Sequence, residues 1–278
     1  MQSSGGIFMP RYGGSTQGTI TAGVINNMKI LSVLIAAFDA KNWLADCLDS
    51  VFSQELPPGW QIQVLLGVDG CDETLKCACA FNYPELTIIH LTKNQGTYVT
   101  FNTLMRYAKG ELICRFDADD VMKPGYFTEQ IPLLETRYDV TRTWSIYSDE
   151  ALQPTSHVLA HKFYHPEGGL NRRPADGQFI ARREVMETLG GFRAWRCGAD
   201  TEFFKRSRIA GYRTGVVEQF LYLRRIHKNS LTAHPDTNFS SSLRLSLEKK
   251  VKDFEQQYRK GQLSLKVEAE YANAHVVL

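Results

Sequence analysis

The sequence lacks several features that would place it in a specialised class of protein. Its 278 residues carry a formal net charge of only +2, so no overall basic field indicates nucleic acid as a partner. The six cysteines contain no CxxC pair, and a chain of this length needs no disulfide framework. We therefore expect reduced thiols in a cytoplasmic protein.

Long hydrophobic runs and a leader pattern are absent as well. The longest apolar run, Ile30 to Phe38, is less than half the length of a membrane span and is typical of a buried strand. No basic stretch followed by an apolar one opens the chain, so we expect no signal peptide. The sequence predicts no transmembrane segment. Glu and Asp interrupt the lysines near the C-terminus, so we expect at most weak association with a membrane surface.

The composition that is present predicts a folded protein in three parts. Hydrophobic residues make up 43% of the chain and charged residues 22%, which suits a globular protein with a sizeable core. Residues 1–28 are rich in Gly, Ser and Thr and predict a mobile extension. We expect one domain over residues 29–235 and a helical tail over 236–278. The tail helix packs either on the domain or on a partner chain, which leaves an oligomer open.

Apolar strand patterns alternate with amphipathic helix patterns from Lys29 onward. This alternation predicts an α/β fold with a mostly parallel central sheet and helices on both faces. The expected strands are 29–38, 61–68, 85–91, 111–116, 141–150, 218–223 and a strand that leads into the helix ending at Gly190. The other expected helices are 42–54, 73–81, 97–110, 125–138, 200–212 and about 240–261.

Acidic residues gather where the expected strands end. Asp39 follows the first strand, Asp69 the second, and Asp117, Asp119 and Asp120 the fourth. Ligands of such sheets bind beyond the carboxyl ends of the strands, so we expect all five to face one crevice. A D-x-D-D cluster suits Mg²⁺ or Mn²⁺, which is usually held together with phosphate oxygens. A solvated acidic loop is the alternative.

Five motifs, in order, resemble the family-two inverting glycosyltransferases of GT-A fold, over about Lys29 to Thr232. They are SVLIAAFDAKNWLADCLDSVFSQ, VDGCDET, NQGTYVTFN, AKGELICRFDADD, and LGGF followed by GADTEFFKR. Three positions depart from the family pattern. Val68 replaces an acidic residue, Ala199 stands where Glu is common, and Phe101 stands where many members carry Arg.

The resemblance implies residues that bind the donor and a metal. It places the metal, Mn²⁺ or Mg²⁺, at Asp119, Asp120 and His227. The residues expected to bind the donor, a nucleotide sugar and most simply a UDP-sugar, are Asp39, Asp69, Lys93, Asp117, Asp119 and His227. An aspartate can accept the N3–H of uracil, which favours UDP. A turn aspartate, a surface lysine and a structural histidine are the alternatives.

The acceptor side is expected at the start of the 200–212 helix. The resemblance implies that Asp200 is the general base that deprotonates the acceptor hydroxyl. A first-turn acid that stabilises the helix dipole is the alternative. Glu202 is a second candidate acid or a surface residue. Trp195 and Arg196 either bind an acceptor sugar or pack in the core. The basic residues Arg224, Arg225 and Lys228 are expected to add positive charge near the diphosphate.

These features together predict a metal-dependent inverting glycosyltransferase. The expected acceptor is a glycan or a lipid-linked saccharide. A sugar-nucleotide nucleotidyltransferase is one alternative, although the segment AAFDAKNW lacks the Gly-rich basic loop that it needs. A non-catalytic glycan-binding module is the other, because Val68 and Ala199 replace acids.

Overall fold

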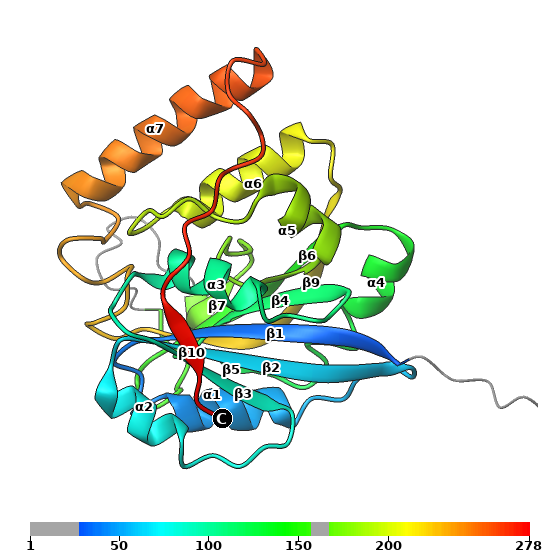
Figure 1. Cartoon of the computed structure of the whole chain (residues 1–278), viewed down its shortest axis with the longest axis vertical. Coiled ribbons are helices and arrows are strands. Elements are labelled where there is room, and N and C mark those ends of the chain that lie inside the picture. The colour runs from blue at the N-terminus through cyan, green and yellow to red at the C-terminus, as the bar shows by residue number, and fades with distance from the viewer. Residues whose placement is uncertain (1–27, 157–166) are drawn as a thin grey trace, which may run out of the picture.

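Four parallel strands form the centre of the molecule. The structure is a computed structural model that describes residues 28–156 and 167–278, so nearly all of the expected extension lies outside the described residues. In the centre, β1 (Lys29–Ala37) lies between β2 (Trp60–Asp69) and β4 (Leu112–Asp117), and β3 (Leu86–Leu91) pairs with β2. Figure 1 shows these strands side by side. Their interior residues are almost all buried, as apolar strands covered on both faces should be.

The sheet continues on both sides of this centre. Among the described residues it has ten strands, and the main path runs β10-β3-β2-β1-β4-β8-β6-β9-β5, with β7 paired to β6. The further elements are β5 (Val121–Met122), β6 (Val140–Ser148), the 3₁₀ turn η1 (Glu167–Gly169), β7 (Leu170–Asn171), β8 (Phe179–Arg182), β9 (Thr214–Arg225) and β10 (Ala274–Val276). Strand β8 is antiparallel to β4 and β6, so the sheet is mixed beyond its parallel centre.

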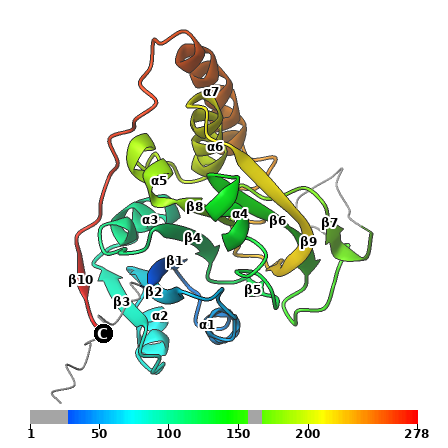
Figure 2. The ribbon, with the colours of Figure 1, turned by 90° about the vertical axis from the view of Figure 1, so that its right-hand side faces the viewer.

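Helices cover both faces of the sheet and enclose two apolar cores (Figures 1 and 2). One core lies under α1 (Leu44–Phe52), α2 (Asp72–Ala78) and α4 (Ile131–Thr136). The other lies under α3 (Thr97–Met105), α5 (Arg183–Leu189) and α6 (Ala199–Ile209), and α7 (Ser242–Arg259) packs on α6. The predicted fold class is confirmed. No helix within residues 28–156 and 167–278 is long and apolar enough to cross a membrane.

Two helices are shorter than the sequence pattern predicts. The expected helix over 125–138 is helical only in α4, which has Pro132 in its first turn, and residues 124–130 form turns instead. The helix expected to end at Gly110 ends at Met105. Gly110 packs against β1, where a Cβ would lie 2.5 Å from the backbone nitrogen of Ser32.

The C-terminal segment returns across the domain as an extended chain. After α7 the backbone crosses α5, where the Val267 amide donates to the Leu189 carbonyl. It then reaches the sheet edge, where β10 pairs antiparallel with β3 (Figure 1). The expected tail helix is confirmed in α7, but the added edge strand was not predicted. The division at residue 235 stays a prediction, and the contacts with β3 and α5 tie residues 265–278 to the main body.

Glu202 is fully buried in an ion network that joins α6 to α7. Its carboxylate accepts from Arg206 at 2.9 Å and from Arg193 at 3.0 Å, and the Tyr258 hydroxyl of α7 donates to it as well. Arg206 is itself fully buried and also donates to the Leu189 carbonyl at 2.6 Å. Glu202 is therefore a structural residue, and both roles that the sequence suggested for it, a second acceptor-side acid and a surface residue, are wrong.

Replacing Glu202 with glutamine should destabilise the fold. It leaves Arg206 buried beside a neutral partner, and breaking a buried pair in this way costs ~3–5 kcal/mol. We expect the melting temperature to fall by on the order of 10 °C in differential scanning fluorimetry. Glu255→Gln is the matched control, because its pair with Lys205 is partly exposed and should contribute under ~1 kcal/mol. Equal melting temperatures of the two variants would contradict a structural role for Glu202.

Candidate active site

The carboxyl ends of the parallel strands bring the strand-end aspartates to one edge of the sheet. Asp69 is the last residue of β2 and Asp117 the last of β4, with β1 and its following Asp39 between them. Asp119 and Asp120 follow in the turn that leads to β5. The expected gathering is therefore present, but the five carboxylates differ in what they already bind.

Asp69 is occupied by backbone groups. Its carboxylate is 2% exposed and accepts from the amides of Gln95 and Gly96, each at 2.8 Å. Burial raises the pKa of Asp69, and these two amides oppose the rise. Asp69 thus holds the loop that leads into α3. Its contact with the base stays a prediction, and such a contact would have to share a carboxylate that is already bound on both oxygens.

Asp39 lies in an exposed turn at the end of β1. It has a φ of +50°, uncommon for a residue with a side chain, and accepts from the Asn229 side chain at 3.2 Å. Its neighbour Phe38 is 55% exposed and offers a ring face that the sequence analysis missed. Lys93 is exposed in the loop between β3 and α3. The nucleotide-binding roles of Asp39 and Lys93 stay predictions.

Asp119 and His227 form a polar pair of the kind that holds a divalent cation. The imidazole Nε2 lies 2.8 Å from Asp119 Oδ2, and the carboxylate is 26% exposed. Trp43 flanks His227 at a ring distance of 5.4 Å and stacks over the Arg225 guanidinium at 4.5 Å. One oxygen and one nitrogen donor fit Mn²⁺ or Mg²⁺, because such ions keep most positions for phosphate and water.

Asp120 is not in contact with this pair, and its role as a metal ligand stays a prediction. It is 2% exposed, accepts the Arg225 amide at 3.0 Å, and accepts the Gln178 side chain on its other oxygen. Burial, followed by the charges of Asp119 and Asp117, raises the pKa of Asp120 well above its usual range. Within the described residues, no three His, Cys, Asp or Glu side chains are grouped to hold a metal ion. Both Asp120 oxygens face protein donors.

Asp200 and Asp117 meet around one guanidinium. Asp200 lies in the first turn of α6, is 19% exposed, and its Oδ2 is 3.5 Å from Arg115 Nη1. Asp117 is 36% exposed, and its Oδ1 is 3.4 Å from Arg115 Nη2. Burial raises the pKa of Asp117, and the Arg115 charge opposes the rise. The other Asp200 oxygen accepts the Thr201 amide at 2.8 Å, and the catalytic role of Asp200 stays a prediction.

The remaining candidates have contacts within the protein. Trp195 packs on Phe254 of α7 at a ring distance of 6.0 Å, which corresponds to the core-packing alternative. Arg196 is exposed and pairs with Asp236 at 3.8 Å. Arg225 donates to the Asp119 carbonyl at 2.9 Å and to Asp46 at 2.7 Å, so it fixes the turn around Asp119 rather than facing a ligand.

The residues that the sequence analysis missed had a weak signal. Arg115 stands two positions before Asp117 in an apolar strand, so both side chains point to the same face. A charged residue inside such a strand indicates a buried partner. Gly177 and Gln178 carried no signal, because their segment comes 60 residues after the acidic cluster and is brought back to it only by β8.

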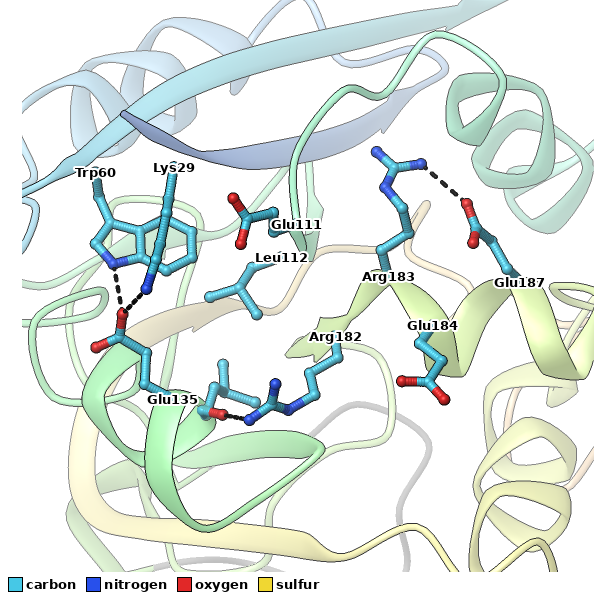
Figure 3. A pocket seen from close by; sticks show the side chains of 10 residues that line it. Lys29, Trp60, Glu111, Leu112, Glu135, Arg182, Arg183, Glu184 and Glu187 are labelled. Atoms are coloured by element: carbon cyan, nitrogen blue, oxygen red, sulfur yellow. Dashed lines mark hydrogen bonds and ion pairs between the residues drawn. The ribbon is translucent and has the colours of Figure 1, made fainter. Parts of the chain in front are cut away.

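A separate pocket of about 400 Å³ lies at the amino ends of the parallel strands, opposite the strand-end aspartates (Figure 3). It is lined by the first residues of β1, β2 and β4 and by the start of α5. Lys29 and the Trp60 indole both donate to Glu135, and Arg183 pairs with Glu187 at 3.3 Å. The charges of these two pairs are satisfied within the protein. The pocket contains none of the strand-end aspartates.

Comparisons with known proteins agree with the fold and the motif order. The model described as "Glycosyl transferase family 2" matches residues 32–221. Hyaluronan synthase from Pasteurella multocida is 26% identical over 174 residues, which make up 62% of this chain and only 17% of that protein. The chain thus spans a small part of the length of that relative.

Two solved structures have the same fold at low identity. S. aureus TarS 1-349 in complex with UDP-GlcNAc has a TM-score of 0.63 and 16% identity, covering 86% of this chain and 72% of that one. The mannosyltransferase PcManGT from Pyrobaculum calidifontis, in complex with GDP-Man and Mn²⁺, has a TM-score of 0.53 and 17% identity, covering 72% and 58%. Since the family model matches more than half of the chain, the chain belongs to glycosyltransferase family 2.

Proposed function

We propose that this enzyme transfers a sugar from a UDP-linked donor to a hydroxyl group of a glycan or a lipid-linked saccharide, with inversion at the anomeric carbon. The observation that carries the proposal is that Asp117 and Asp200 contact the same Arg115 guanidinium, with Asp119 two positions after Asp117 and paired with His227. The site thus combines an Asp–His pair that can hold a cation with a carboxylate on a separate helix. The relatives are consistent with a nucleotide-sugar donor.

On the donor side, exposed groups at the ends of β1 and β4 would bind the nucleotide. The Phe38 ring is free to stack on a base, and Asp39 can accept the N3–H of uracil. Asp117 would bind the ribose or a water held near the diphosphate. Asp119 and His227 would hold Mn²⁺ or Mg²⁺, which as a Lewis acid stabilises the leaving diphosphate.

On the acceptor side, Asp200 would act as the general base. It would take the proton of the acceptor hydroxyl as that oxygen attacks the anomeric carbon from the face opposite the diphosphate. A pocket of about 240 Å³ lies between α6 and α7, and its lining includes Gly198 and Thr201, which are close to Asp200 in the sequence.

Binding of UDP should require a divalent cation. We expect the dissociation constant measured by calorimetry in Mn²⁺ to rise at least ~10-fold when EDTA replaces the metal, a loss of ~1.4 kcal/mol. The physical reason is that Asp117 and Asp119 present negative charge to a diphosphate unless a cation lies between them. Equal affinity with and without EDTA would exclude the metal. A screen of nucleotide sugars for transfer or slow hydrolysis would then identify the donor.

A further inference from the structure

A buried arginine lies between two carboxylates of the proposed site. Arg115, in β4, is 4% exposed. Its Nη2 approaches Asp117, which ends the same strand, and its Nη1 approaches Asp200, which lies 85 residues later at the start of α6. The two distances are 3.4 and 3.5 Å. One guanidinium is thus in contact with a donor-side and an acceptor-side carboxylate at once.

Aromatic rings hold this guanidinium in place. The Phe101 ring centroid lies 4.5 Å from its central carbon, and the Tyr98 and Phe192 centroids lie at 5.3 and 5.5 Å. Tyr98 and Phe101 come from α3, and Phe192 follows the Gly-Gly turn after α5. The Arg115 Nε has no hydrogen-bond partner, so the rings rather than further polar groups fix the position of the cation.

Gly177 marks the point where the three charged groups meet. A Cβ at this position would lie 3.5 Å from Asp117 Oδ2, 3.7 Å from Arg115 Nη1 and 3.8 Å from Asp200 Oδ2. The backbone before β8 therefore passes directly over the cluster. Arg115 is thus enclosed by rings and by this backbone, and Asp117 and Asp200 are its ion-pair partners.

We propose that Arg115 is a positioning residue. It holds Asp117 and Asp200 in one fixed geometry, so that the base is correctly placed relative to the bound donor. This inference rests on the proposed function. Two carboxylates at a shared site repel one another, and a cation between them removes that repulsion. A planar guanidinium can direct separate N–H groups at both carboxylates, whereas the point charge of lysine cannot match this arrangement.

A double-mutant cycle on the transfer rate tests this role. We expect Arg115→Gln to lower kcat by ~10- to 100-fold at saturating donor, because a displacement of about 1 Å is enough to cost that much. In the Asp200→Asn background the same change should lower kcat by no more than ~3-fold, since the contribution through Asp200 is already lost and saturating donor offsets a displaced Asp117. Arg115→Lys should recover part of the rate, because it keeps the charge.

Controls separate positioning from general stability. Arg206→Gln removes another buried arginine, which pairs with Glu202 and has no hydrogen bond or ion pair with Asp117, Asp119 or Asp200. It should lower the melting temperature while kcat per folded enzyme stays within ~2-fold of the unmodified protein. Losses in kcat that simply multiply in the double variant would overturn the proposal. So would a normal kcat in Arg115→Gln with only a lowered melting temperature.

A crystal structure of Arg115→Gln gives a readout that needs no reaction. We expect the Asp117 and Asp200 carboxylates to separate by more than about 1 Å relative to the unmodified protein, a shift that is large on the scale of catalytic geometry. Unmoved carboxylates would overturn the proposal. If the unmodified protein neither binds UDP nor acts on any nucleotide sugar, the proposed function fails, and this structural comparison still decides the positioning role.

Discussion

Replacing Asp200 with asparagine should reduce sugar transfer by ~10²–10⁴-fold, the usual range for the loss of a general base. This corresponds to ~3–5 kcal/mol of lost transition-state stabilisation. Asparagine has nearly the same size and can still accept the Thr201 amide through its side-chain oxygen. UDP affinity should therefore change little, because Asp200 would act on the acceptor rather than on the nucleotide. Steady-state kinetics and calorimetry on the same preparation measure both quantities.

Asp176→Asn is the matched control for this result. Asp176 is another carboxylate near Asp200, and its pKa is raised by burial and by the Asp200 charge. It pairs with Arg142, so its side chain is already committed to a structural contact. We expect a loss of transfer under ~10-fold for this variant. Near-normal transfer in Asp200→Asn with a lowered melting temperature would mean that Asp200 only stabilises its helix, and a large loss in Asp176→Asn would point to that residue as the base.

The parallel centre of the fold was predictable from local sequence because its signals are local. Each of the strands β1 to β4 is an apolar run followed by a helix pattern, and such alternation leaves little choice of topology. The edge strand β10 was not predictable. It comprises three residues, and two of them are exposed, so no apolar run indicates it. Its pairing partner β3 lies far away in sequence, and only the return of the chain across α5 brings the two together.

The candidate site shows the same division between local and distant signals. Strand ends placed Asp117 and Asp119 correctly at the edge of the sheet, but spacing alone could not show which oxygen faces solvent. Asp120 is adjacent to Asp119, yet its partners Arg225 and Gln178 lie 105 and 58 positions further along the chain. Glu202 looked like a second acid in a polar helix start, whereas tertiary packing with Tyr258 buries it.

Asp119→Asn should abolish most of the metal-dependent binding of UDP, while Asp120→Asn should leave it largely intact. The first change removes the carboxylate beside His227, so we expect the dissociation constant for UDP in Mn²⁺ to rise at least ~10-fold, a loss of ~1.4 kcal/mol. Transfer should fall with it. The melting temperature should change little, because Asp119 is partly exposed.

Asp120→Asn is expected to be tolerated for a reason that lies in its buried surroundings. The asparagine oxygen can still accept the Arg225 amide, and its new N–H₂ group faces Gln178, whose Oε1 has no hydrogen-bond partner. Rotation of the Gln178 amide would then restore the bond in the opposite sense, since Gln can donate or accept. Calorimetry with UDP and Mn²⁺, together with melting curves, compares the two variants. Equal losses of UDP affinity would mean that both carboxylates bind the metal and that Asp120 turns outward when the donor arrives.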